Sequence, residues 1–305
     1  LLPTCPTGGH RLSHMTSTAL LTDMYELTMI KAAMHAGTAF RRCTFDLFPR
    51  RLPTGRSYGV VAGTGRALEA LKHFRFGPEE IEFLRDRGIA DDMLAEWLGD
   101  YTFTGNIRGY GEGELFFSGS PVLVLEGSFA EVVLLETLML SIFNHDSAVA
   151  SAASRMTLAA EGRPIIEMGG RRTHEWAAVA SARAAWIAGF GSSSDLEAAR
   201  SWGIPVSGTA AHAFTMLFDS EEDAFKAQLE AMGEQTTLLV DTYDVSTGIA
   251  NAVAAGGPQL GAIRIDSGDL GVLARQAREQ LDALGATGTR IVLSGDLDEY
   301  SIAAL

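Results

Sequence analysis

Reactive side chains in the C-terminal half of the sequence share one position: each stands at or just past the end of a short apolar run. The set comprises Arg171, Arg172, Ser192, Thr209, His212, Asp241, Asp244, Asp266, Ser267, Asp269 and Asp296. In a parallel α/β barrel the C-terminal ends of the strands share one face, and such folds carry out their chemistry there. A series of such turns therefore predicts one common site.

His212 lies in IPVSGTAAHAF (204–214), among residues too small to cover an imidazole. This neighbourhood leaves the ring accessible to a large ligand. Imidazole can act as a general base, or as a nucleophile that accepts a phosphoryl group. The alternative is a structural histidine, which is the commoner role of a lone histidine.

Among these turns, the segment RIDSGDL (264–270) gives the most specific indication of a ligand site. Strand alternation places Arg264 and Asp266 on the same side. Ser267 and Gly268 then present backbone amides before a helix N-terminus, which suits an anion or a sugar hydroxyl. Asp266 could hold a ribose diol or a metal ion, and the alternative is an ordinary helix cap.

Other turns add phosphate-binding and acidic groups. Arg171 follows paired glycines in MGGRRTH, where a guanidinium suits phosphate or pyrophosphate. The alternative for this arginine is pairing with carboxylates. Asp241 and Asp244 in VDTYDV could coordinate Mg²⁺ together with substrate phosphates. They could equally cap the next helix, and we expect Asp244 to do so.

Strands and helices must position these groups. Beyond about residue 130, apolar runs alternate with amphipathic helices, which predicts a parallel sheet with right-handed crossovers and favours an irregular α/β barrel. The preceding part predicts a smaller α/β domain. We expect domains at 15–129 and 130–305 after a disordered extension at 1–14. The expected local elements are a helix over 16–36, a strand over 43–50 paired with one over 57–63, a hairpin over 113–127 turned at Gly119, a long helix over 130–160, and a helix N-cap at Ser193 or Ser194.

Composition narrows the functional class. The chain has 305 residues, and 24 Lys and Arg stand against 38 Asp and Glu, so the formal net charge is −14. This charge argues against broad binding to nucleic acid or to an anionic membrane. The two cysteines form no disulfide framework, which indicates a reducing, cytoplasmic compartment. The apolar run over 132–143 is too short to span a bilayer and predicts a buried helix.

The turns, taken in order, resemble a known family. ALLTDMYELTM (19–29), GGRRTHEWA, GFGSSSD, GIPVSGTAAHAF, VDTYD, IRIDSGDL and LSGDLDEY are similar to segments of nicotinate phosphoribosyltransferases. The resemblance implies the type II phosphoribosyltransferase fold, an α/β domain with an irregular α/β barrel. It also implies the reaction: nicotinate and phosphoribosyl pyrophosphate give nicotinate mononucleotide and pyrophosphate, coupled to ATP hydrolysis, in NAD biosynthesis.

The resemblance also implies roles for single residues. His212 matches the histidine that is transiently phosphorylated, and Asp266 is the second expected catalytic residue. The expected contacts to nicotinate come from Tyr25, Thr209 and Arg264. The expected contacts to phosphoribosyl pyrophosphate come from Arg171, Asp241, Ser267, Gly268, Gly295 and Asp296.

Further expectations concern ligands, assembly and length. The resemblance implies ATP as co-substrate, Mg²⁺ or Mn²⁺ with unidentified protein ligands, and a homodimer with shared active sites. The nearest alternative functions are those of relatives that use nicotinamide or quinolinate, and TDMYELTM favours nicotinate. The alternative from a different functional class is a catalytically inactive homologue that only binds nucleotides or occupies a dimer interface. The family continues past Leu305 into a loop that holds the 5′-phosphate, so we expect a C-terminally truncated and inactive chain.

Overall fold

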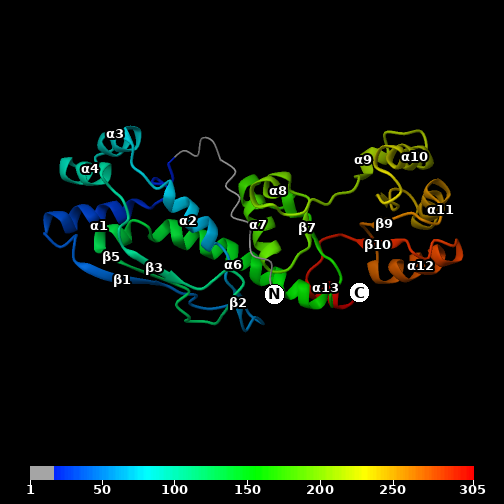
Figure 1. Cartoon of the computed structure of the whole chain (residues 1–305), viewed down its shortest axis with the longest axis horizontal. Coiled ribbons are helices and arrows are strands. Elements are labelled where there is room, and N and C mark those ends of the chain that lie inside the picture. Colours follow the sequence, from blue (N-terminus) through cyan, green and yellow to red (C-terminus); the bar gives the residue numbers. More distant parts are fainter. Residues whose placement is uncertain (1–16) are drawn as a thin grey trace. The chain divides into compact units, whose positions relative to one another are not determined.

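The computed structural model describes residues 17–305, and the extension expected at 1–14 lies outside them. The chain divides into two compact units. The first holds the described residues up to Thr157 together with Pro164–Val206, and the second holds Leu158–Arg163 and Ser207–Leu305. Figure 1 labels most of the elements of both units. The domain boundary between residues 129 and 130 rests on the sequence pattern and stays a prediction.

An antiparallel sheet organises the first unit. Strand β5 (Leu123–Ser128) lies between β1 (Arg42–Leu47) and β3 (Asn106–Gly109), and it pairs antiparallel with both. The predicted strand near residue 43 is therefore confirmed. The burial of β5 alternates along the strand, as expected when one face of a sheet covers a core.

Two predicted strand pairings in this unit are wrong. Strand β2 (Gly59–Val60) pairs with β4 (Leu115–Phe116) instead of β1, and β4 and β5 form no hairpin with each other. Serines of helix α6 (Glu136–Ala159) decide where the β2 segment lies: Val60 N donates to Ser151 Oγ at 2.8 Å, and Ala62 N donates to Ser147 Oγ at 3.2 Å. Buried backbone groups need such partners, and here a distant helix supplies them.

The helix expected over 16–36 begins later, at Met24, and ends at His35 as α1. The long helix expected over 130–160 is broken into α5 (Phe129–Val133) and α6. Glu26 helps to set the starts of α1 and α6. Its fully buried carboxylate accepts a hydrogen bond from Asp23 N at 3.1 Å and another from Thr137 N at 2.8 Å. One carboxylate thus satisfies amides at the starts of α1 and α6.

The segment Phe129–Ala159 is long and apolar enough to cross a membrane, but 56% of its most apolar window is buried inside the molecule. Leu138, Met139 and Phe143 belong to the core of the first unit. The predicted burial of the run over 132–143 is confirmed, but the helix is interrupted there at Leu134 and Leu135. The other helices of the first unit are α2 (Thr64–Lys72), α3 (Pro78–Asp86), α4 (Asp92–Gly99), α7 (Glu175–Ile187) and α8 (Leu196–Trp202).

Parallel pairing begins at the end of the first unit. Strand β6 (Ile166–Glu167) pairs with β7 (Ser192–Ser193), and Val206 adds a single parallel bridge to Ser193. Asp195 is the N-cap of α8, so the prediction of Ser193 or Ser194 is wrong. The reason is that Ser193 Oγ donates to Glu167 Oε2 at 2.7 Å, whereas the Asp195 carboxylate accepts from Ala198 N.

The second unit contains a parallel sheet in the order β10-β9-β8. Its strands are β8 (Thr237–Leu239), β9 (Ala262–Ile265) and β10 (Arg290–Leu293), and its helices are α9 (His212–Thr215), α10 (Glu221–Met232), α11 (Val245–Gly256), α12 (Leu270–Ala283) and α13 (Glu299–Ala303). Leu238, Val240 and Ile263 form its core with Phe225 of α10. The predicted mixed α/β class with parallel strands is confirmed, and closure into a barrel stays a prediction.

Candidate active site

The C-terminal ends of β8, β9 and β10 meet at one edge of the sheet. In the parallel register Leu239 pairs with Arg264, and Ile265 pairs with Leu293. The turns that follow these strands therefore lie side by side, as the sequence predicted. This edge gathers Thr209, His212, Asp241, Arg264, Asp266 and Ser267, together with Thr242 and Ser294, which the sequence did not single out.

Arg264 is the centre of a hydrogen-bond network. Its Nη1 donates to Thr209 Oγ1 at 2.7 Å, its Nη2 donates to Asp266 Oδ1 at 2.7 Å, and its Nε donates to Ser294 Oγ at 2.7 Å. Ser294 Oγ in turn donates a short hydrogen bond to Asp266 Oδ1. The side chain of Arg264 is only 15% exposed. Most of its donors are therefore engaged, and its charge is balanced by Asp266.

Asp241 fixes the turn after β9. Its Oδ2 accepts from Asp266 N at 2.9 Å and from Ser267 Oγ at 2.7 Å. The side chain is only 1% exposed, so its other oxygen, Oδ1, is shielded from water. Among residues 17–305 this atom has no hydrogen-bond partner. An unpartnered buried carboxylate oxygen is costly, so this atom is suited to a ligand or to a cationic group.

His212 is the first residue of α9, and both of its ring nitrogens face polar groups. Nδ1 lies 3.2 Å from Thr242 Oγ1. Nε2 lies 4.0 Å from Asp241 Oδ1 and 3.9 Å from Asp266 Oδ2. The side chain remains 37% exposed. The ring is therefore accessible to a ligand and faces two carboxylates that could stabilise positive charge on it.

The electrostatic state of Asp266 follows from its partners. Burial acts to raise the pKa of this carboxyl, but the hydrogen bonds from Ser294 and Arg264 outweigh burial and hold the pKa below its usual range. Asp266 therefore faces His212 as a carboxylate. The positive charges of Arg264 and of a protonated His212 act in the same direction.

Helix capping in these turns falls to other acids. Asp269 caps α12 by accepting from Val272 N at 3.0 Å, and Asp244 caps α11 by accepting from Thr247 N at 2.8 Å. The capping prediction for Asp244 is confirmed. Because Asp269 fills the capping role after β9, Asp266 is left to bind Arg264 and Ser294 and to face His212.

The turn after β10 requires glycine. A Cβ built on Gly295 would lie 2.8 Å from the carbonyl oxygen of Asp266, and the φ of Gly295 is +127°. Asp296 also has a positive φ, of 51°. The LSGD turn therefore approaches the Asp266 backbone as closely as the missing side chain of Gly295 allows, and the two turns form one surface.

Comparison with known proteins assigns the chain to a family. Residues 20–144 match the model of the nicotinate phosphoribosyltransferase N-terminal domain. The chain is 66% identical over 294 residues to nicotinate phosphoribosyltransferase pncB1 of Mycobacterium tuberculosis, covering 94% of this chain and 65% of that protein. The enzyme of Bacillus subtilis is 37% identical, with 94% and 60% covered.

The chain belongs to the nicotinate phosphoribosyltransferase family. The crystal structure of human nicotinic acid phosphoribosyltransferase matches with a TM-score of 0.81 and 28% identity, covering 93% of this chain and 70% of that one. The chain spans about 65% of the length of the M. tuberculosis relative. The family assignment agrees with the motifs that the sequence analysis identified.

Of the residues expected to bind substrate, Tyr25 and Arg171 lie in the first compact unit. Tyr25 belongs to α1, and its hydroxyl donates to Glu136 Oε1 at 2.8 Å. This hydrogen bond raises the pKa of Tyr25, while the residue stays 42% exposed. Arg171 is exposed in a 3₁₀ turn (Gly169–Arg171) that follows β6. Both side chains are accessible to a ligand.

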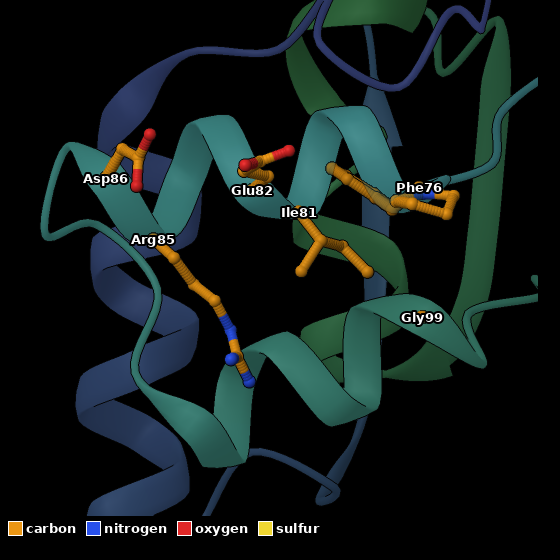
Figure 2. A pocket seen from close by; sticks show the side chains of 7 residues that line it. Phe76, Ile81, Glu82, Arg85, Asp86 and Gly99 are labelled. Carbon is orange, nitrogen blue, oxygen red and sulfur yellow. The ribbon is translucent and has the colours of Figure 1, made fainter.

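A pocket in the first unit involves none of the predicted site residues. Figure 2 shows this pocket beside α3 and α4, and its lining residues are Phe76, Pro78, Ile81, Glu82, Arg85, Asp86 and Gly99. Ser294 and Thr242 are the site residues that sequence reasoning missed. The available signal was position, because each lies in a turn that directly follows a parallel strand.

Proposed function

We propose that the protein catalyses phosphoribosyl transfer to nicotinate, coupled to ATP hydrolysis. Nicotinate, phosphoribosyl pyrophosphate, ATP and water would give nicotinate mononucleotide, pyrophosphate, ADP and phosphate. The observation that carries this proposal is the accessible His212 facing Asp241 and Asp266, in a chain 66% identical to a nicotinate phosphoribosyltransferase. The reaction is the step that forms a pyridine nucleotide in NAD biosynthesis.

The transfer itself is a displacement at the anomeric carbon of the ribose. The pyridine nitrogen forms the new bond to this carbon as the bond to pyrophosphate breaks, and the bonding electrons leave with pyrophosphate. Positive charge develops on the ribose, and a fixed carboxylate stabilises such charge. We assign that role to Asp266, which Arg264 and Ser294 hold in place.

His212 would accept the γ-phosphoryl group of ATP. The imidazole supplies an electron pair to phosphorus, and the bond to the bridging oxygen breaks as ADP leaves. The partial exposure of the ring admits the nucleotide, and the carboxylates of Asp241 and Asp266 stabilise positive charge on the phosphorylated ring. Hydrolysis of the phosphohistidine would complete the coupling cycle.

Mg²⁺, or Mn²⁺, fits the oxygen-rich edge of this site. Asp241 Oδ1 is buried without a hydrogen-bond partner, and Asp266 Oδ2 faces the same imidazole. Carboxylate oxygens are the ligands that Mg²⁺ prefers. Among residues 17–305 no group of at least three His, Cys, Asp or Glu side chains is suited to a metal ion. Substrate phosphates and water would therefore complete its coordination. The ion would neutralise charge on the phosphates.

The remaining assignments concern substrate binding. Tyr25 would stack on the pyridine ring, and Thr209 with Arg264 would receive its carboxylate. Because most donors of Arg264 are engaged, this carboxylate would compete with Asp266 for the guanidinium. The phosphoribosyl pyrophosphate ligands would be Arg171, Asp241, Ser267, Gly268, Gly295 and Asp296.

Assembly and location complete the proposal. We place the parallel strands in an irregular barrel of the type II phosphoribosyltransferase fold. The protein would act in the cytoplasm as a homodimer with shared active sites. Its partners would be the small-molecule substrates, with no nucleic acid or membrane.

The test is direct product formation. Purified protein is incubated with radiolabelled nicotinate, phosphoribosyl pyrophosphate, Mg²⁺ and ATP, and the labelled mononucleotide is separated by chromatography. If the proposal is right, product depends on phosphoribosyl pyrophosphate and increases with ATP. Product from the chain that ends at Leu305 would show that the inactivity expected of the truncated chain is wrong. Labelled nicotinamide and quinolinate run in parallel test substrate choice. Nucleotide binding without product would instead identify a catalytically inactive member of the family.

A further inference from the structure

The surroundings of His212 differ between its two ring nitrogens. Nε2 faces carboxylate oxygens of Asp241 and Asp266 at 4.0 and 3.9 Å. Nδ1 faces one neutral hydroxyl, that of Thr242, at 3.2 Å. A lone pair on Nε2 would point toward negative charge, whereas a proton there is stabilised by it. In the neutral ring the proton is therefore favoured on Nε2.

This tautomer defines what Thr242 does. With the proton on Nε2, Nδ1 is a hydrogen-bond acceptor, and Thr242 Oγ1 is the donor at the right distance. The torsion that rotates an imidazole about its Cβ–Cγ bond has broad minima, so the carboxylates near 4 Å hold the ring only loosely. The contact from Thr242 fixes the plane of the ring.

The backbone at Thr242 is held independently of its hydroxyl. The preceding residue, Asp241, is tied to Asp266 N and Ser267 Oγ. Two residues further on, Asp244 caps α11 through Thr247 N. Removing the hydroxyl of Thr242 therefore leaves the turn anchored on both sides, and the loss falls on the imidazole.

We propose that Thr242 is a positioning residue for His212: its hydroxyl donates to Nδ1 and thereby sets the orientation and the tautomer of the imidazole. This inference rests on the proposed function for its catalytic consequence only. The hydrogen bond itself exists in the protein without substrates, so it can be tested without turnover.

The experiment compares Thr242→Val, which keeps the shape and removes the hydroxyl, with Thr242→Ser, which retains it. Thr247→Val is the matched control, because Thr247 lies nearby in the first turn of α11 and its hydroxyl donates to Asp244 rather than to His212. The measurement is the ring ¹⁵N spectrum of the protein labelled at histidine, with His212 assigned by the spectrum of His212→Gln.

We expect Thr242→Val to shift the His212 ring signals toward a mixture of tautomers, because the hydrogen bond that engages Nδ1 is lost. Thr242→Ser and Thr247→Val should resemble the wild type. Unchanged ring signals in Thr242→Val would overturn the proposal.

The proposed function can fail separately. If the wild type forms no phosphohistidine, that function is wrong, and the ring spectra still decide the role of Thr242. In that case a shifted ring signal in Thr242→Val, restored in Thr242→Ser, supports the positioning role. Identical spectra for the wild type and Thr242→Val refute it.

Discussion

His212 is the residue on which the ATP-coupled part of the proposal depends. Its imidazole is accessible and faces carboxylates on one side and a hydroxyl on the other. These groups can orient a nucleophile and stabilise the charge that phosphorylation places on the ring. The residue therefore has a testable chemical signature that a structural histidine lacks.

Replacing His212 with alanine should abolish labelling by γ-³²P-ATP, because the acceptor nitrogen is lost. The label in the wild type should be lost in acid and retained in base, as expected of a phosphohistidine. His35→Ala is the matched control, since His35 is an accessible histidine that pairs with Asp91. Equal labelling of wild type and His212→Ala would show that another group accepts the phosphoryl.

Arg264 has both a structural and a binding role. Arg264→Ala should raise the KM for nicotinate by one to two orders of magnitude, since a charge-assisted hydrogen bond contributes about 1.5–3 kcal/mol. Ser294→Ala separates the roles, because it removes the Nε acceptor but leaves the guanidinium. Steady-state kinetics with varied nicotinate measure both. An unchanged KM in Arg264→Ala would place the carboxylate elsewhere.

The ionisation of Asp266 makes the free energy of unfolding depend on pH in the acidic range. Its pKa is lower in the folded protein than in the unfolded chain, so its ionised form stabilises the fold above about pH 4. This contribution is lost as the pH falls through the folded pKa. The difference in unfolding free energy between wild type and Asp266→Asn should therefore shrink on acidification. Urea titrations between neutral pH and pH 3 measure it, and a difference independent of pH would contradict this.

At the scale of elements, Glu26 connects two helices that are far apart in the sequence. Its carboxylate accepts from amides at the start of α1 and of α6, and it is fully buried. Burial raises its pKa above the usual value, although the hydrogen bonds from Thr137 and Asp23 act in the opposite direction. The carboxylate therefore contributes chiefly as a shared hydrogen-bond acceptor.

Glu26→Ala should lower the free energy of unfolding by about 2 kcal/mol, because it removes two capping interactions of about 1 kcal/mol each. Glu82→Ala, an exposed change within α3, should alter stability by less than about 0.5 kcal/mol. Urea denaturation followed by circular dichroism measures both variants. A similar small effect at the two positions would show that the shared cap is unimportant.

At the scale of the whole molecule, each compact unit has its own core. The largest cluster of buried residues includes Leu94 in the first unit, and a separate cluster includes Phe225 in the second. The edge of the β10-β9-β8 sheet, with His212 and its partners, depends on the second cluster. Stability of that cluster is thus a condition for the site.

Phe225→Ala should cost about 3–5 kcal/mol and should raise hydrogen exchange mainly in β8–β10 and α10–α12. Leu94→Ala is the comparison, with a cost of about 2–5 kcal/mol and faster exchange mainly in α1–α4 and β1–β5. Exchange followed by mass spectrometry locates the changes. Uniform deprotection of the chain by both variants would show that the two cores unfold as one.

Local pattern in the sequence was enough to find the strand ends and the residues on them. Asp241 and Asp266 follow apolar runs of the right length, and Arg264 lies within such a run near its end. The alternation with amphipathic helices predicted parallel strands. The cap at Asp244 was also predictable, because it depends on groups within a few residues. These features are encoded locally, so they can be read without knowing what packs against them.

Only the tertiary structure decided which partner each group meets. Arg264 binds Ser294 across 30 positions of sequence and Thr209 across 55. The contact with Ser294 follows from the parallel register of β9 and β10, and the contact with Thr209 from the placement of a loop outside this sheet. The pairing of β2 with β4 likewise differs from the predicted one, since serines of α6 hold the β2 segment. Contacts between distant segments depend on how whole elements pack, and periodicity within one element carries no information about its neighbour.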